Sequence, residues 1–222
     1  RRTGAAQRAT PPPPENAAYE VVIIGLGPTG ATLASLLALC GTHVLVLDRY
    51  DEPYPLPRAV HFDDEIMRVF QTIGIADRVM EIVRVNLGMR FIDSAGKLLL
   101  DWPRPQEIGP QGWHASYRSH QPDLEELLRE AVSRHSNVEI RTGTEVHSVI
   151  DRDDCVQIGY SDIRNGEKAE VSASYVVGCD GANSTVRSAM AVTESDIGLK
   201  ERWVVADLLL NNPKLELGGH TN

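Results

Sequence analysis

The pattern of hydrophobic residues predicts a strand, a helix and a second strand from Tyr19 onward, and mainly short strands in the later part of the chain. Tyr19–Ile24 is an almost continuous apolar run, as in a buried strand, and Ala31–Cys40 is long and apolar enough for a buried helix. Thr42–Leu47 is a second short apolar run. Together these segments predict a strand–helix–strand unit over residues 19–48, of the kind that starts a parallel sheet.

Three further helices are predicted from the spacing of apolar residues. The first covers Asp64–Ile73, with Asp63 placed to cap it, and a short one follows over Ala76–Glu81. The third has Pro122 in its first turn, a position that proline favours, and runs to about Ser133. The expected apolar faces are Ile66, Val69, Phe70 and Ile73 on the first helix and Leu124, Leu127, Leu128 and Ala131 on the third.

Short strands make up most of the remainder. Leu87–Ile92 and Lys97–Trp102 flank a turn sequence and predict a β-hairpin, whereas Arg49–Val60 and Pro103–Trp113 are expected to be loops. A short helix is expected from Ser184. The later predicted strands are Val138–Arg141, Glu145–Ile150, Val156–Ser161, Ala169–Ala173, Tyr175–Gly178 and Trp203–Leu210.

The turn after the first strand carries the sequence Gly25-Leu26-Gly27-Pro28-Thr29-Gly30, a GxGxxG motif. In this context Gly25 permits a tight turn, Gly27 lets a pyrophosphate approach the backbone, and Gly30 lets the helix pack on the strand. The pyrophosphate would lie at the helix N-terminus, which favours anions. Asp48 follows the second strand at the spacing of a ribose-hydroxyl acceptor. The unit predicts a dinucleotide site rather than a structural glycine turn, and the strand-rich middle favours FAD over NAD.

Composition narrows the class of protein. The chain has 222 residues and a formal net charge of −9, which argues against a nucleic-acid-binding surface. No apolar run approaches the ~20 residues of a membrane span. Cys40, Cys155 and Cys179 form no CxxC pair and no zinc spacing, and their odd number argues against a disulfide framework. We therefore expect a cytoplasmic protein. Cys179 is interpreted as a small buried residue that ends a strand, with a nucleophile as the alternative.

Four segments, taken in order, carry a resemblance to a known family. They are the GxGxxG unit, Pro57-Arg58-Ala59 followed by His61-Phe62-Asp63-Asp64-Glu65, Gln121-Pro122-Asp123-Leu124-Glu125, and Gly178-Cys179-Asp180-Gly181-Ala182-Asn183-Ser184-Thr185-Val186-Arg187. Together they resemble the class A flavin-dependent aromatic hydroxylases, in the branch of 3-(3-hydroxyphenyl)propionate hydroxylase and similar phenol hydroxylases. The last segment is specific to this family, whereas GxGxxG is not.

The resemblance implies an α/β fold: a Rossmann-like FAD-binding domain with inserted β-strands and the start of a β-rich substrate domain. Residues 19–85 and 116–192 would form the FAD-binding domain, and residues 86–115 and 193–222 part of the substrate domain. Residues 1–18 include the run Pro11–Pro14 and are expected to be a disordered, proline-rich leader outside the fold.

The resemblance also implies which residues bind FAD. Asp48 would bind the adenosine ribose, where many relatives have Glu, and Arg58 would reach the pyrophosphate or the flavin edge. Gln121 would bond the phosphate–ribityl region, Val146 would meet the adenine through its backbone, and Arg187 would tie its helix to the Asp-Gly turn. The implied set is Gly25, Gly27, Pro28, Thr29, Gly30, Asp48, Arg49, Arg58, Gln121, Val146, Asp180, Gly181 and Arg187. Purely structural roles are the alternative for Arg58, Gln121, Asp180 and Arg187.

The implied reaction is hydroxylation of a phenolic or aromatic ring with NADH or NADPH and O₂, through a flavin C4a-hydroperoxide. The cofactor carries this chemistry, so no catalytic side chain is required. His61 and His114 are the candidates for a general base and a pocket residue, with structural roles as the alternative. The acidic run Asp63-Asp64-Glu65 is explained by a helix N-terminus, and no metal site is expected.

One departure from the family affects the functional prediction. The second FAD motif, a Gly-Asp after a strand in the C-terminal half, is absent from this sequence, and Trp203–Leu210 resembles the first strand of a sheet without its partners. A fragment of a longer enzyme is favoured. The alternatives are a second chain that supplies the rest and a shortened relative that binds FAD weakly or not at all. The expected protein partner is the missing C-terminal half or a second copy in a homo-oligomer. The alternative functions are an epoxidase, halogenase or reductase on the same fold, and a non-catalytic FAD-binding module. The aromatic substrate, the choice of NADH or NADPH and the oligomeric state stay open.

Overall fold

The computed structural model describes residues 17–56, 58–198, 200–202, 204 and 211. The leader expected over residues 1–18 lies outside these residues, apart from its last two positions. The strand expected over Trp203–Leu210 also lies outside them, apart from Val204. Among the described residues, no helix is both long and apolar enough to cross a membrane.

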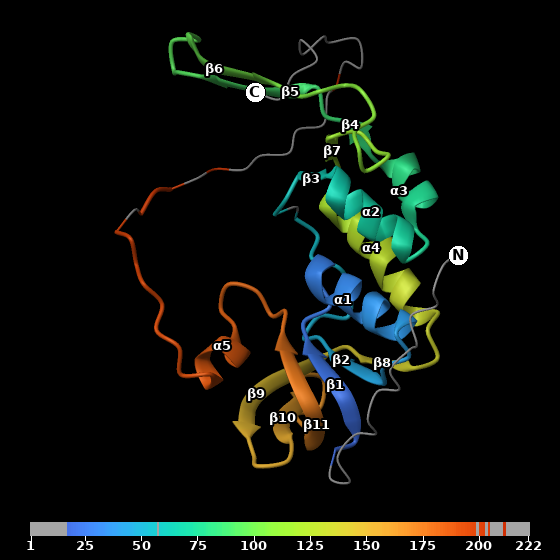
Figure 1. Cartoon of the computed structure of the whole chain (residues 1–222). Helices are drawn as coiled ribbons and strands as arrows, with labels where there is room; N and C mark the ends of the chain where they lie inside the picture. The colour runs from blue at the N-terminus through green and yellow to red at the C-terminus, as the bar shows by residue number, and fades with distance from the viewer. Residues whose placement is uncertain (1–16, 57, 199, 203, 205–210, 212–222) are drawn as a thin grey trace, which may run out of the picture.

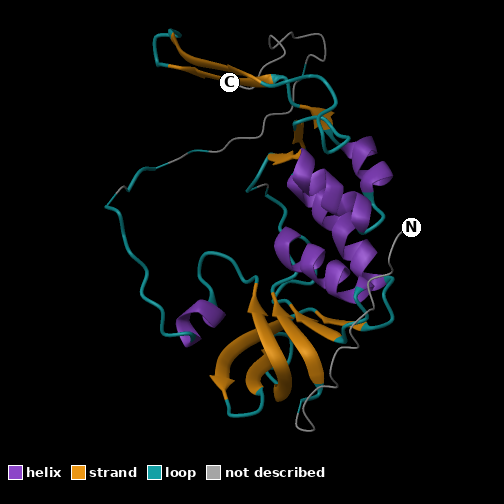
Figure 2. Cartoon of the chain, in the orientation of Figure 1, coloured by secondary structure: helices purple, strands orange, loops and turns teal. Residues whose placement is uncertain are grey.

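A six-stranded sheet forms one end of the molecule, with helices gathered against one of its faces (Figures 1 and 2). The strand order is β8-β2-β1-β11-β10-β9, in which the first four strands run parallel and the last two pair antiparallel. The bounds are β1 Tyr19–Ile24, β2 Val44–Leu47, β8 Val138–Arg141, β9 Thr144–Asp151, β10 Val156–Asp162 and β11 Lys168–Gly178.

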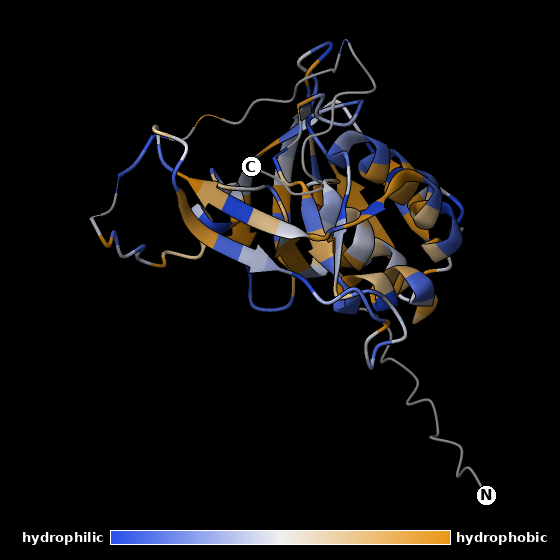
Figure 3. Ribbon diagram, turned by 90° about the horizontal axis from the view of Figure 1, so that it is seen from above, coloured by the Kyte–Doolittle hydropathy of each residue, from blue (hydrophilic) through white to orange (hydrophobic). Residues whose placement is uncertain are grey.

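The central strands are buried on both faces because their side chains alternate between two hydrophobic cores. Val21 and Ile23 of β1 pack on the helical side, with Val44 and Val46 of β2 beside them. The intervening residues of the same strands face the antiparallel strands: Val22, Ile24, Leu45 and Leu47. Figure 3 shows orange, apolar stretches along strands in the interior, and helices that carry both apolar and polar residues. This two-sided burial explains why both strands are continuous apolar runs.

Four helices lie on the side of the first core: α1 (Pro28–Leu39), α2 (Asp64–Thr72), α3 (Ala76–Ile82) and α4 (Gln121–Ser133). The apolar face predicted for α4 is confirmed, since Leu124, Leu128 and Ala131 are buried and Leu127 packs against them. Asp63 caps α2 as predicted, accepting a hydrogen bond of 3.0 Å from the Ile66 N–H.

The face predicted for α2 is partly wrong. Met67 and Phe70 point into the core, while Ile66 is 40% exposed. Phe70 lies edge-on to Phe62, which stacks on Tyr117, so an aromatic cluster from other elements decides the orientation of the helix. Apolar spacing within α2 alone does not contain this information.

Two strand predictions also need correction. Residues Ala169–Ala173 and Tyr175–Gly178 form one strand, β11, which pairs with β10 up to Ala173 and with β1 from Ala173 onward. A small sheet of order β3-β7-β4 was not predicted. Its strands, β3 His61–Asp63, β4 Arg84–Val85 and β7 Ser116–Arg118, are too short to show an alternating pattern.

The predicted hairpin and the last helix are confirmed. Strands β5 (Gly88–Ile92) and β6 (Leu98–Pro103) pair antiparallel and lie at the end of the molecule opposite the six-stranded sheet (Figure 1). All residues of β6 are exposed. Helix α5 (Thr185–Ala189) starts after Ser184, whose side chain accepts a hydrogen bond from the Arg187 N–H.

Candidate functional site

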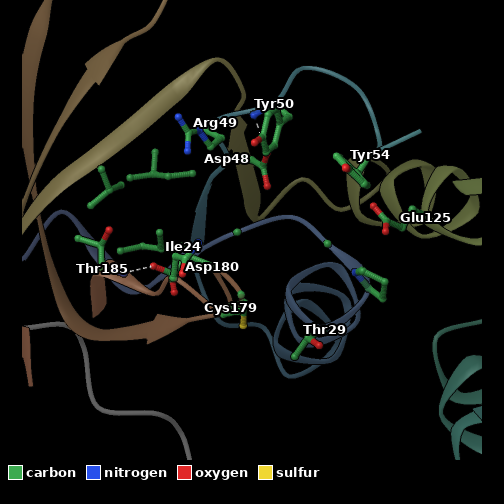
Figure 4. Close-up of a pocket in the computed structure, with 18 of the residues that line it drawn as sticks. Ile24, Thr29, Asp48, Arg49, Tyr50, Tyr54, Glu125, Cys179, Asp180 and Thr185 are labelled. Carbon is green, nitrogen blue, oxygen red and sulfur yellow. Dashed lines mark hydrogen bonds between the residues drawn. The ribbon is translucent and has the colours of Figure 1, made fainter. Parts of the chain in front are cut away.

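A cavity of about 620 Å³ opens at the edge of the sheet where β1, β2 and β11 end. The carboxyl ends of parallel strands are the usual place for ligands in open α/β sheets. Figure 4 shows the lining side chains that come from these strand ends, from the loop after β2 and from α4. Of the predicted residues, the following line it: Gly25, Gly27, Pro28, Thr29, Asp48, Arg49, Arg58, Gln121, Val146, Asp180 and Gly181.

The three motif glycines occupy different environments. A Cβ at Gly25, whose φ is +104°, would lie 2.3 Å from the Cys179 carbonyl oxygen, and a Cβ at Gly30 would lie 1.9 Å from the carbonyl oxygen of Gly25. These two positions therefore require glycine for packing. A Cβ at Gly27 would meet no atom within 4 Å, although Gly27 lines the cavity. At this position glycine leaves open space toward the cavity.

The N-terminus of α1 faces the same space. Gly27 is the N-cap residue, and among the described residues no side chain caps the helix and no acid lies in its first turn. Gly27, Pro28 and Thr29 all line the cavity. The unsatisfied N–H groups and the positive end of the helix dipole make this position suitable for a phosphate or another anion.

Asp48 connects the end of β2 to the glycine turn. Its carboxylate, which is buried, accepts hydrogen bonds from the Leu26 N–H at 2.5 Å and from the Tyr50 N–H at 2.7 Å. The Arg129 guanidinium lies 3.9 Å away. An ionised carboxylate has about four acceptor positions, so these contacts leave capacity for a ligand hydroxyl.

Asp180 shapes the turn after β11. One carboxylate oxygen accepts from the Ser184 hydroxyl at 2.6 Å, and the other from the Thr185 N–H at 2.6 Å (Figure 4). Arg187 does not line the cavity: its guanidinium donates to the Ala182 carbonyl oxygen at 2.5 Å and forms an ion pair with Glu194. Arg187 thus ties α5 to the turn, and Asp180 and Gly181 face the cavity.

Two arginines reach the cavity from the loop after β2. Arg49 pairs with Glu145 at 3.0 Å, but both side chains are more than half exposed, so the pair contributes little stability. The Arg58 guanidinium lies 4.1 Å from the centre of the Tyr54 ring, a cation–π distance. Both cations can therefore exchange partners with an anionic ligand at small cost.

Several cavity residues were not predicted, among them Tyr50, Tyr54, Glu125, Arg129, Thr144 and Asn183. Glu125 and Arg129 follow Gln121 at intervals of four residues, so the helical period of α4 contained a signal for them. The tyrosines lie in an irregular loop, where no periodicity exists to indicate orientation.

The two candidate histidines do not line the cavity. His61 lies on β3, and burial, helped by Arg104, lowers its pKa and favours the neutral ring. His114 donates through Nδ1–H to the Gln106 carbonyl oxygen at 2.8 Å. Cys179 does line the cavity, but burial and the neighbouring Asp180 raise the pKa of its thiol, which opposes a nucleophilic role at neutral pH.

Fold and cavity define a dinucleotide-binding α/β protein. Comparison of sequences shows that the chain belongs to the FAD-binding domain family, whose model matches residues 18–220. The predicted fold class and the predicted resemblance are therefore confirmed.

Two curated relatives carry hydroxylase names. The chain is 42% identical over 206 residues to the probable NADH-specific resorcinol 4-hydroxylase of Rhodococcus jostii, in an alignment that covers 91% of this chain and 38% of the relative. It is 38% identical over 207 residues to the 3-(3-hydroxy-phenyl)propionate/3-hydroxycinnamic acid hydroxylase of Mycolicibacterium gilvum, covering 92% of this chain and 35% of the relative. The chain thus spans little more than a third of the length of these relatives.

Solved structures agree with this assignment. The p-nitrophenol 4-monooxygenase PnpA of Pseudomonas putida matches with a TM-score of 0.72 and 25% identity, over 80% of this chain and 45% of that one. The flavin-dependent monooxygenase PieE, solved with FAD and substrate, matches with a TM-score of 0.69 and 27% identity, over 79% of this chain and 32% of that one.

Proposed function

We propose that this chain binds FAD and forms the FAD-binding part of an aromatic hydroxylase that uses NADH or NADPH and O₂. The observation that carries the proposal is the uncapped N-terminus of α1 beside Gly27, at the edge of the sheet where β1, β2 and β11 end. Free N–H groups and open space at this position suit the pyrophosphate of a dinucleotide. The names of the relatives support the class of reaction.

The lining residues divide naturally along a bound FAD. The first turn of α1 would hold the pyrophosphate, and the remaining acceptor positions of Asp48 would bind the adenosine ribose. Val146, at the start of β9, would meet the adenine, with Arg49 nearby. Toward the flavin, the proposed contacts are Arg58, Gln121, Asp180 and Gly181. Gly25, Gly30 and Arg187 would act indirectly, by packing the turns that carry these groups.

When bound, FAD supplies the redox chemistry and the activation of O₂. The chain's own residues would bind and orient it and keep its phosphates neutralised. We assign residues 19–85 and 116–192 to this FAD-binding unit and residues 86–115 and 193–222 to the start of a substrate-binding unit. The position of the β5–β6 hairpin, away from the six-stranded sheet, supports the division (Figure 1). A phenolic substrate is proposed from the relatives' names.

A cytoplasmic location is proposed on a separate ground. All three cysteines, Cys40, Cys155 and Cys179, are free. Free thiols persist in a reducing compartment, which supplies the same nicotinamide cofactors that the proposed reaction consumes.

The test is a titration of the purified chain with FAD, followed by desalting and an absorbance spectrum. FAD should be retained, ADP should compete with it, and FMN should bind more weakly because it lacks the adenosine half that the motif recognises. Oxidation of NADH or NADPH in the presence of resorcinol and related phenols is then measured with the FAD-loaded chain.

The outcomes separate the two parts of the proposal. Retention of FAD with competition by ADP supports the binding site, and phenol-dependent oxidation supports the hydroxylase. Binding without phenol-dependent oxidation contradicts catalysis by this chain alone. If FMN and FAD bind equally, or if ADP does not compete, the proposed placement of the pyrophosphate at α1 is wrong.

A further inference from the structure

A stripe of three polar residues runs along one face of α4. Gln121, Glu125 and Arg129 are spaced at intervals of four, and all three line the cavity. The other side of the helix is apolar and packs into the core through Leu124 and Leu128. Helix α4 therefore has a core-facing apolar side and a polar face that points toward the β2–β3 loop, of which the structure describes residues 48–56 and 58–60.

Gln121 holds the far end of the β2–β3 loop. Its amide oxygen accepts two backbone hydrogen bonds, from the Arg58 N–H at 2.8 Å and from the Ala59 N–H at 2.7 Å. Its amide nitrogen donates to the Glu125 carboxylate at 2.5 Å. Because Glu125 accepts only, it fixes which end of the Gln121 amide faces the loop. Both side chains are buried, which makes each of these contacts costly to lose.

Arg129 holds the near end of the same loop. Its guanidinium donates to the Asp51 carbonyl oxygen at 3.2 Å and lies 3.9 Å from the Asp48 carboxylate, and the side chain is only 14% exposed. Asp48 in turn accepts from the Tyr50 N–H. Other charged groups near this end are Arg164, 3.9 Å from the Asp51 carboxylate, and Arg49, which pairs with Glu145, but the side chains of both pairs are exposed.

We propose that Glu125 and Arg129 are positioning residues of the FAD site, which fix the two ends of the β2–β3 loop so that Tyr54 and Arg58 face the cavity. This inference rests on the proposed function, because the loop is assigned there to FAD. Glu125 acts through Gln121, and Arg129 acts on the loop directly. The Arg58 side chain at the anchored far end stacks on Tyr54, which lies between the two ends, and both residues line the cavity.

The first test needs no cofactor. Amide hydrogen exchange, resolved to single residues, is measured on the whole chain without FAD. In Glu125→Ala, exchange at Arg58 and Ala59 should rise about tenfold, with Tyr50 unchanged, because one hydrogen bond of the relay is lost. In Arg129→Ala, exchange at Tyr50 should rise and Arg58 should be unchanged. Glu125→Gln keeps the acceptor and should behave as the unchanged chain.

Controls and contrary outcomes follow from the same data. Glu126→Ala removes an exposed acid from the same helix and should change neither end. A uniform rise that includes the core amide of Val46 would mean that Glu125 and Arg129 only stabilise the fold, and would overturn the proposal. If Glu125→Gln exchanges as fast as Glu125→Ala, the acceptor relay is wrong.

The second test uses FAD affinity. Glu125→Ala and Arg129→Ala should each raise the dissociation constant of FAD about three- to tenfold, the equivalent of one hydrogen bond, while Glu125→Gln and Glu126→Ala leave it unchanged. If the exchange pattern is seen but affinity is unaffected in all variants, the loop is anchored as described and does not serve the FAD site. If the unchanged chain does not bind FAD, the proposed function fails, and the exchange pattern still decides whether the two residues position the loop.

Discussion

The cavity has two walls that are built in different ways. The first wall is the β2–β3 loop with the polar face of α4, and the second is the turn at residues 179–185 that leads to α5. The second wall is held by near neighbours in the sequence, since Asp180 bonds Ser184 and Thr185. The first wall depends on contacts between residues more than sixty positions apart, such as Arg58 with Gln121. The bonds around Asp180 are therefore local, although the Cys179 N–H also donates to the Ile24 carbonyl oxygen of β1 at 2.7 Å, whereas the first wall forms only when α4 packs into place.

The difference has a consequence for stability. Local hydrogen bonds at a turn form together with the turn and cost little chain entropy, whereas long-range contacts also report on packing of the whole domain. The acid of the first wall, Asp48, is buried and joins three segments, while Asp180 is half-buried and serves one turn. Disruption of the first wall should therefore destabilise the protein more.

The largest effect is expected where the two walls meet, at Gly25. In Gly25→Ala, the new Cβ collides with the Cys179 carbonyl oxygen of the second wall, and φ is positive, so the free energy of unfolding should fall by about 3 to 5 kcal/mol. Denaturant unfolding measures it. The matched control is Gly27→Ala, whose Cβ meets no neighbour within 4 Å and whose φ is −71°. It should leave stability unchanged while weakening FAD binding, and an equal loss of stability in both variants would contradict the separate roles.

The next largest effects are the losses of stability in Asp48→Ala and Asp180→Ala, which compare the first wall with the second. Asp48→Ala removes the acceptor of two backbone N–H groups, one of them the buried Leu26 N–H, and should lower the free energy of unfolding by about 3 kcal/mol.

Asp180→Ala removes a capping interaction at a half-buried turn and should cost about 1 kcal/mol. Asp153→Ala, an exposed acid in the turn between β9 and β10, is the control and should change stability by less than about 0.5 kcal/mol. Equal losses at Asp48 and Asp180 would show that the two walls are anchored alike.

The same division explains what the sequence predicts. The Asp-Gly turn and the Asp63 and Ser184 caps depend on residues a few positions apart, and their geometry follows from motifs. The glycine turn also follows from its motif, although Gly25 lies against the distant Cys179. Gln121 was placed in the site from a motif, but its hold on Arg58 and Ala59 requires knowledge of how α4 packs. The orientation of α2 was partly wrong for the same reason, because an aromatic cluster of distant residues determines it.

The smallest expected effect concerns Cys179, which stands in the second wall, lines the cavity and packs against the first hydrophobic core (Figure 4). Burial and Asp180 raise the pKa of its thiol, so at neutral pH the reactive thiolate is scarce and its fraction rises only at higher pH. Iodoacetamide should therefore modify Cys179 more slowly than the exposed Cys40. Timed alkylation followed by peptide mass spectrometry measures both rates.

Asp180→Asn turns this rate difference into a test of the second wall. Removal of the negative charge lowers the pKa of the Cys179 thiol, so its alkylation should accelerate while Cys40, far from the change, reacts as before. Added FAD should slow Cys179 alone, because Cys179 lines the cavity that the ligand would occupy. If FAD protects Cys40 equally, the second wall does not face the ligand. If Asp180→Asn leaves the alkylation rate of Cys179 unaltered, Asp180 does not control the thiol. Either result would leave this wall as only a structural turn.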